Sequence, residues 1–434
     1  MCTRAALVRA LCVAIILGAS AAPFSRALPA TSAPALAARV DVVTHTDGAI
    51  LDFNALNRDA FYRSLYTPAR CFSHAYTFGR HPTPLLGAYR VGALRGCRDG
   101  SDADAFFNEY SANDTATAQA ALNAFQHPPD CSARSHGHIV DFHVAGFAST
   151  VHFYMYTFLR TIGAARVAHL APASIVARPW GWAPSDCAGG SPDCFFEPIT
   201  NCSANATIAT AERYMVAYPP SPDDRNTILD GAALATHLGS KKSWSWVRAQ
   251  ALRYLLRPNA ATAAHAEAFA RATFPRGLPR PLAAVFVRGT DKGTESPVFN
   301  VSAHFAALEP LATSIGLRDV YLNSDSDASI EEARRLFGHR YRLHVPSVER
   351  DVGQVHKGDA NGVRIYVGMT PAQKAAQVRD TLADIYLSAS ADVHVGTLSS
   401  NRCRIVDALR LAAGKDAFAY VDVDGRYLVE GMRR

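Results

Sequence analysis

The second half of the chain alternates short apolar runs with longer stretches of helical spacing. Four apolar runs have the length of buried strands: 282–287, 319–322, 341–345 and 392–395. Three stretches have the length and spacing of helices: 329–337, 371–390 and 402–413. Strands that alternate with helices indicate a parallel sheet. We therefore predict an α/β fold with a parallel sheet in its C-terminal part.

The first half contains one similar unit. A His/Gly-rich stretch that starts near residue 135 is followed by the apolar-aromatic run VHFYMYTFLRTIG, which has helical length and ends at Gly163, and then by the strand candidate ARVAHLA. This order of strand, loop, helix and strand is the unit of a doubly wound sheet. A further helix is predicted over 244–256, just before Pro258.

Residues at the helix ends support these boundaries. Asp327 or Ser329 can cap the helix that Gly338 closes. Thr370 precedes Pro371, and proline is favoured in the first turn of a helix.

The N-terminus has the pattern of a secretory leader. Arg4 and Arg9 precede a short apolar run that ends in small residues. We predict a signal peptide or short signal-anchor over 1–22 and an Ala/Pro/Ser-rich linker over 23–40. Any contact with a membrane is expected only through that anchor, which is short for a bilayer span. The predicted location is the secretory pathway, in the Golgi lumen, with secretion as the alternative.

Composition and charge exclude some classes of protein. The chain is 49% hydrophobic and 19% charged, which argues against a disordered or fibrous protein. The net charge is +6, with Lys and Arg spread along the chain, so a nucleic-acid binder is not expected.

Cysteine usage fits an oxidising compartment. Outside the leader, six cysteines lie in the first half of the chain, enough for three disulfides, and Cys403 is left over. Cys187 with Cys194 and Cys71 with Cys97 are candidate pairs.

Ligands of parallel α/β sheets bind at the carboxyl ends of the strands. That rule singles out three loops: 288–295, 323–327 and 396–401. The first holds Arg288, Asp291, Lys292 and Glu295, which are either solvated ion pairs or functional groups, and the position after a strand favours function. In the third, Ser400 begins a helix, where it can cap the helix, face a phosphate, or both.

Two metal-site readings are disfavoured. Asp325-Ser326-Asp327 is similar to the Asp-x-Asp signature of metal-dependent sugar-nucleotide enzymes, but no other ligands gather near it in the sequence. The histidines over 136–152 lack zinc-protease spacing and are interpreted as loop and packing residues.

Several motifs together resemble the α-1,6-fucosyltransferases of glycosyltransferase family 23. They are AVFVRGTDKGTE, YLNSDSD, DTLADIYLSASADVHVGTLSSNRCR, WVRAQALRYLLRP and AGFASTVHFYMYTFLRTIGAARVAHL. The resemblance implies a GT-B-like architecture, with an acceptor-side α/β domain carrying disulfides over 41–280 and a Rossmann-type GDP-fucose-binding domain over 281–434. It also implies metal-independent, inverting transfer of fucose from GDP-fucose to a glycan, with no cofactor.

The resemblance also implies roles for individual residues. Arg288 matches the arginine that grips the donor diphosphate, Glu295 the catalytic base and Lys292 its supporting lysine. The remaining matches to the donor site are Asp291, Asp325, Asp384, Ser400, Gly146 and Asn401, and Cys131 with Cys202 matches a disulfide pair. Fixed cations would stabilise the leaving GDP in place of a metal, and Glu295 would deprotonate the acceptor hydroxyl.

This chain departs from the motif at several positions. The histidine and second arginine of His-x-Arg-Arg-x-Asp are replaced by Phe286 and Gly289, which puts guanine contact and phosphate affinity in question. Gly396 replaces the cysteine that would pair with Cys403, and Asn401 replaces a glutamine. The SH3-like domain and coiled-coil stem of the animal enzymes are expected to be absent.

The predicted function is fucose transfer in an α-1,6 linkage to core GlcNAc of an N-glycan. A protein O-fucosyltransferase is an alternative of the same fold. A catalytically silent luminal protein that binds glycan or nucleotide is an alternative of another class.

Overall fold

The computed structural model describes the chain in segments. These are residues 112–142, 146–172, 174–177, 179–184, 187, 190–214, 244–289, 298–348, 350, 370–413 and 420–423. The predicted leader and linker and the candidate pair Cys71 and Cys97 lie outside these segments. In the described segments, no helix combines the length and hydrophobicity that crossing a membrane would require.

The first half forms a small parallel sheet. Strand β1 (Ser135–Ile139) lies between β2 (Arg166–Leu170) and β3 (Glu212–Tyr214). Helix α7 (Phe147–Gly163) connects β1 to β2 and buries most of its apolar-aromatic side chains. The predicted order of strand, loop, helix and strand is confirmed, including the helix end at Gly163.

The second half forms a larger sheet in which every pairing is parallel, in the order β6-β5-β4-β7-β8. Its strands are β4 (Leu282–Val287), β5 (Asp319–Ser324), β6 (Arg342–His344), β7 (Val393–Gly396) and β8 (Tyr420–Asp422). The four strands predicted from the apolar runs are confirmed, and β8 is added at one edge. Both sheets are parallel, so the predicted α/β class is confirmed.

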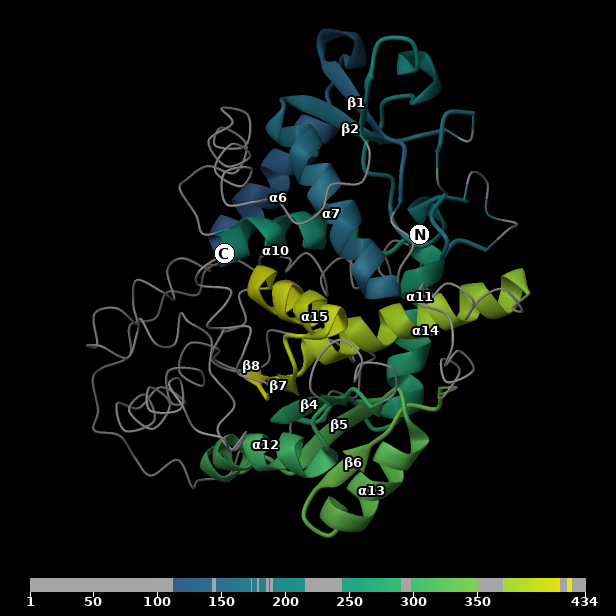
Figure 1. Ribbon diagram of the computed structural model, residues 1–434. Coiled ribbons are helices and arrows are strands. Elements are labelled where there is room, and N and C mark those ends of the chain that lie inside the picture. The colour runs from purple at the N-terminus through teal and green to yellow at the C-terminus, as the bar shows by residue number, and fades with distance from the viewer. Residues whose placement is uncertain are drawn as a thin grey trace, which may run out of the picture.

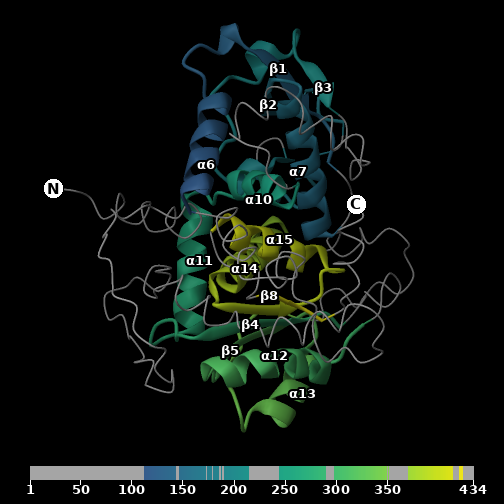
Figure 2. The same cartoon turned by 90° about the vertical axis from the view of Figure 1, so that its left-hand side faces the viewer.

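Helices cover both faces of the larger sheet (Figures 1 and 2). The helices of the second half are α12 (Val301–Ile315), α13 (Asp327–Phe337), α14 (Pro371–Ser390) and α15 (Asn401–Ala412). Figure 2 shows α12 and α13 on one side of β4 and β5, with α14 and α15 on the other. All six residues of β4 are buried, since helices cover both of its faces.

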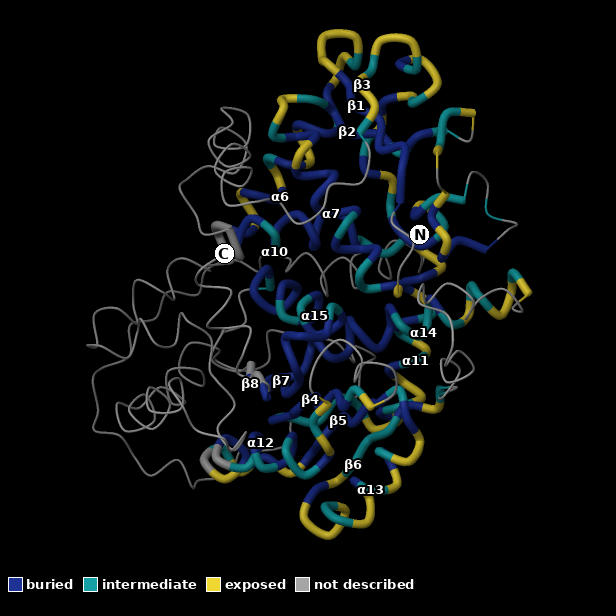
Figure 3. Tube along the Cα trace, viewed as in Figure 1, coloured by how far each residue is buried: buried dark blue, intermediate teal, exposed yellow. Residues whose placement is uncertain are grey.

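The two sheets are joined by a layer of helices that share one hydrophobic core. Three helices of the first half are α6 (Ala112–Gln126), α10 (Trp244–Leu255) and α11 (Ala260–Thr273). Helix α10 packs against α15 and α7, and α11 packs against α14. Figure 3 shows this central layer as largely buried. The predicted domain boundary at residue 280 stays a prediction.

Short 3-10 helices occur in the loops of the first half, at Cys131–Ala133, Pro192–Cys194 and Asn205–Thr207. Two disulfides tie these loops together. Cys131 and Cys202 are bonded, as the resemblance implied, and Cys187 is bonded to Cys194. Cys403 is a buried thiol in α15.

Two helices of the second half are capped differently at their N-termini. Thr370 and Gln373 form a reciprocal capping box at the start of α14, with Pro371 in the first turn as predicted. The predicted cap of α13 is wrong, because the helix already begins at Asp327 and Ser326 occupies the cap position without a side-chain capping bond. Asp327 instead lies beside Arg350.

Candidate donor site

The three predicted loops follow three neighbouring strands. β4 lies between β5 and β7, and all three are parallel, so their carboxyl ends meet at one edge of the sheet. Arg288 follows β4, Asp325 follows β5 and Ser400 lies in the loop after β7. The topology therefore brings these residues to the same edge. Asp291, Lys292 and Glu295 lie outside the described residues.

The loops after β4 and β5 are tied together by one carboxylate. Oδ2 of Asp325 lies 2.9 Å from Nε of Arg288. Oδ1 of Asp325 accepts a hydrogen bond from the backbone N–H of Gly289 at 2.7 Å. A side chain at Gly289 would crowd this loop, since its Cβ would lie 3.2 Å from Oγ of Ser329. Asp325 therefore orients the arginine.

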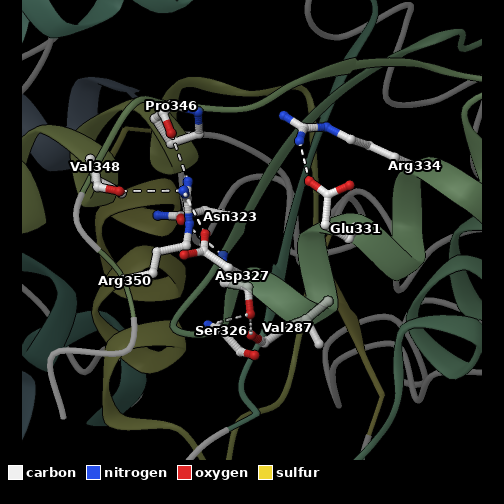
Figure 4. Close-up of polar contacts among 10 residues, drawn as sticks. Val287, Asn323, Ser326, Asp327, Glu331, Arg334, Pro346, Val348 and Arg350 are labelled. Carbon is white, nitrogen blue, oxygen red and sulfur yellow. Dashed lines mark hydrogen bonds and ion pairs between the residues drawn. The ribbon is translucent and has the colours of Figure 1, made fainter. Parts of the chain in front are cut away.

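The turn after β5 is fixed by a second set of bonds (Figure 4). The Ser324 hydroxyl donates to the carbonyl of Val287 at 2.7 Å and accepts from the N–H of Ser326 at 3.1 Å. Arg350, in the segment after β6, donates to the carbonyl of Pro346 at 2.6 Å and approaches Asp327 at 3.4 Å. Each aspartate of the Asp325-Ser326-Asp327 motif thus lies beside an arginine.

Helix α15 begins at this edge with an unsatisfied hydroxyl. Ser400 is 2% exposed and occupies the cap position of α15, but its side chain makes no capping bond. Its Oγ has no hydrogen-bond partner among the described residues. The first N–H groups of a helix and its dipole favour an anion. Of the two readings of Ser400, simple capping finds no support in this geometry.

Basic side chains surround this helix start. Arg404 donates through Nε to the carbonyl of Leu398 at 2.5 Å and through Nη1 to Oδ1 of Asn401 at 3.3 Å. Arg248, on α10, stacks on the ring of Tyr156 at 5.8 Å. The charges of Arg248 and Arg404 both act on His152, which contacts the first residue of α15.

Helix α7 contacts the same turn. Nε2 of His152 lies 3.1 Å from the backbone oxygen of Asn401, so this ring nitrogen carries the proton. Burial lowers the pKa of His152 well below its usual range, and the charges of Arg248 and Arg404 lower it further, so the ring is neutral. Gly146, one residue before α7, is exposed at the start of this helix. The second turn of α7, which carries His152, thus contacts the first turn of α15.

Asp384 lies in α14 and is 4% exposed. Its Oδ1 accepts from the Tyr321 hydroxyl at 2.6 Å, and its Oδ2 accepts from Nε of Arg402 at 2.8 Å. The structure thus places Asp384 under the sheet edge and in contact with Arg402, rather than beside Arg288. Sequence reasoning does not single out Arg402. The available signal is that Arg402 shares a helix face with the apolar residues Val406 and Leu409, an unusual place for a charge.

The relatives of this chain in sequence include a fucosyltransferase. No family model matches the chain. Over 313 residues, the chain is 24% identical to an alpha-(1,6)-fucosyltransferase of Drosophila melanogaster. The match covers 66% of this chain and 45% of the fly protein, so the chain spans less than half the length of that relative. This distant match confirms the resemblance to fucosyltransferases that the motifs predicted.

Solved structures give a weaker likeness. POFUT1 in complex with GDP aligns at 14% identity with a TM-score of 0.33, covering 66% of this chain and 99% of that one. POFUT1 in complex with GDP-fucose aligns at 14% identity with a TM-score of 0.34, covering 66% of this chain and 98% of that one.

Proposed function

We propose that this chain is a fucosyltransferase that transfers L-fucose from GDP-fucose to a glycan without a metal ion. The observation that carries the proposal is the 313-residue match to a fly alpha-(1,6)-fucosyltransferase. The topology supports the proposal, because it brings Arg288 and the start of α15 to the carboxyl edge of one parallel sheet. We accordingly propose the same donor and the same class of reaction for this chain.

The proposed chemistry follows from the charge that develops on the leaving group. As the bond between fucose and phosphate breaks, negative charge accumulates on GDP and needs fixed donors to stabilise it. Arg288, already oriented by Asp325, supplies one. The N-terminal N–H groups of α15 and the Ser400 hydroxyl supply others. These groups would serve in place of a metal.

Inverting transfer also needs a base on the opposite face of the sugar. We propose Glu295 for this role and Lys292 as the cation that keeps it ionised. Both follow Arg288 by a few residues in the sequence. Asp291, Asp384, Gly146 and Asn401 remain proposed donor-site residues.

For the acceptor we propose the core GlcNAc of an N-glycan, as the motifs imply, joined in the α-1,6 linkage that the name of the fly relative carries. Protein O-fucosylation is the alternative of the same fold. A silent nucleotide-binding protein is the second alternative, favoured by Gly289 where the motif has a second arginine. We propose the secretory pathway as the location, and the two disulfides support an oxidising compartment.

The test is incubation of the full chain with GDP-fucose and a mixed panel of acceptors, read by mass spectrometry. The panel contains N-glycans and peptides that offer Ser and Thr hydroxyls for O-fucosylation. We expect fucose on an N-glycan core and none on the peptides. The Glu295→Gln variant should bind GDP and transfer nothing. Fucose on the peptides alone would favour the alternative acceptor, and binding of GDP without transfer to any acceptor would favour the silent protein.

A further inference from the structure

Arg402, in the first turn of α15, is held rigidly beneath the sheet edge. It is 7% exposed. Its Nε donates to Oδ2 of Asp384 at 2.8 Å, and its Nη2 donates to the same oxygen and to Oγ of Ser388 at 3.1 Å. Its Cζ lies 3.8 Å from the ring centre of Phe286. The guanidinium is therefore fixed between α14 and β4.

One nitrogen of this guanidinium is left over. Nη1 of Arg402 is buried and has no hydrogen-bond partner among the described residues. Buried donors in native proteins are nearly always paired, so an orphan calls for a missing ligand or a specific role. Because the other two nitrogens are committed to Asp384 and Ser388, Nη1 cannot turn toward them without breaking those bonds.

The charge of Arg402 is already neutralised. Burial acts to lower the pKa of Arg402, but the adjacent carboxylate of Asp384 outweighs burial and raises that pKa, so the guanidinium keeps its charge. The Tyr321 hydroxyl donates a 2.6 Å hydrogen bond to Oδ1, the other oxygen of the Asp384 carboxylate. Because the ion pair has no net charge, its remaining Nη1–H group acts on a ligand as a directional hydrogen-bond donor rather than as a positive charge. Such a donor suits a neutral acceptor better than a phosphate.

Other groups are placed to bind the phosphates of the proposed donor. Arg288 and the start of α15 lie at the sheet edge, whereas Phe286, on which Arg402 stacks, lies two residues back inside β4. Phe286 also stands at the motif position where the histidine is missing. Arg402 thus places a nitrogen donor beside that position.

We propose that Nη1 of Arg402 donates a hydrogen bond to the base of the bound nucleotide and selects a base with acceptors on that edge. Guanine presents O6 and N7 as acceptors, whereas adenine presents an amino donor in place of O6. This inference rests on the proposed function, since it deepens the choice of GDP as the nucleotide. It makes Arg402 a specificity-determining residue.

The test is calorimetric binding of GDP, IDP and ADP to the full chain. IDP keeps O6 and N7 but lacks the 2-amino group, so it isolates the edge that Arg402 would read. The variant Arg402→Met/Asp384→Asn removes both buried charges together and leaves neither unpaired. Asp384→Asn alone keeps the guanidinium and is measured beside it, because Asp384 is itself a proposed donor-site residue. We expect the wild type to bind GDP and IDP better than ADP. We expect the double variant to bind GDP and IDP about 10-fold more weakly, with ADP unchanged.

The matched control is Arg410→Met. Arg410 is another buried arginine of α15, and it donates to the backbone carbonyls of Ala391 and Asp392. That variant should keep the preference for GDP over ADP. If the double variant does not fold, Arg402→Lys keeps a cation beside Asp384 but lacks the forked guanidinium, and it should lose the same preference.

Three outcomes separate the claims. A folded double variant that keeps the wild-type ratio of GDP to ADP affinity overturns this inference alone. Equal losses for GDP and ADP place the contact at the diphosphate and also overturn it. A wild-type chain that binds none of the three nucleotides contradicts the proposed function itself.

Discussion

Nε of Arg288 lies 2.9 Å from Oδ2 of Asp325, so the ends of two neighbouring strands are linked by an ion pair. The two side chains are 30% and 24% exposed, and an ion pair in contact with solvent contributes little to stability. The ion pair instead fixes the orientation of the Arg288 guanidinium. A guanidinium that is fixed before the ligand arrives needs no rearrangement when charge develops on a leaving phosphate.

The first prediction concerns this arginine. Arg288→Gln should weaken GDP binding about 10- to 100-fold, because a charge-assisted bond to phosphate is lost. Titration calorimetry with GDP measures the effect. Arg334→Gln is the control, since Arg334 pairs with Glu331 on the exposed surface of α13 and should not change GDP binding. Equal affinities for the wild type and Arg288→Gln would remove Arg288 from the donor site.

The second prediction separates capping from ligand binding at Ser400. Ser400→Ala should leave the free energy of unfolding within about 0.5 kcal/mol of the wild type, because no capping bond is lost. Asn259→Ala should cost about 1 kcal/mol, because the Asn259 side chain caps α11 through the N–H of Thr262.

Urea denaturation compares the two variants. Ser400→Ala should also weaken GDP binding, whereas Asn259→Ala should not. A loss of stability at Ser400 equal to that at Asn259, with GDP binding unchanged, would show that Ser400 is a plain helix cap.

The apolar runs predict the strands of the larger sheet but not the order in which those strands lie. The runs of β4, β5 and β7 are recognisable because a strand covered on both faces is largely apolar. The convergence of Arg288, Asp325 and Ser400 followed from one rule, that parallel strands share a carboxyl edge. The cap of α13 was missed because Ser326, Asp327 and Ser329 are all good cap residues, and only backbone angles distinguish them.

The network around Asp384 could not be predicted. Arg402 is eighteen residues away in the sequence, and its contact with Asp384 depends on how α14 and α15 cross. His152 is still farther from Asn401, with 249 residues between them, and that contact depends on how the two halves of the chain pack. Neither separation leaves a periodic signal in the sequence.

The third prediction concerns acidic pH. His169 contacts His136 at 2.8 Å and stacks on His138. Burial, followed by the charges of His138 and His136, lowers the pKa of His169 from 6.5 to about 3. Between those values the unfolded chain binds a proton that the folded chain does not, so stability falls as the pH falls.

From pH 7 to pH 5, this one histidine should cost about 2 kcal/mol of unfolding free energy. Denaturant titrations at the two pH values measure the slope. His169→Gln should lose less stability over the same range than the wild type does. The same slope in both proteins would rule out His169 as a source of the acid sensitivity.

The fourth prediction uses the position of Gly396. A Cβ at Gly396 would lie 2.7 Å from Sγ of Cys403, too close for a non-bonded contact. A cysteine there can relieve the contact by bonding to Cys403, so Gly396→Cys should form a disulfide. Thiol titration under denaturing, non-reducing conditions should find one thiol fewer than in the wild type, because the new bond also consumes the thiol of Cys403. Gly181→Cys, at a position with open space, should add one.

The most direct test of the account is the release of GDP from GDP-fucose by the full chain with an N-glycan acceptor and EDTA. The account predicts GDP release and fucosylated product at the same rate with and without the chelator, and loss of both in Arg288→Gln and Glu295→Gln. Activity that stops in EDTA and returns with a divalent cation would contradict the proposal that Arg288 and the start of α15 stabilise the leaving diphosphate without metal.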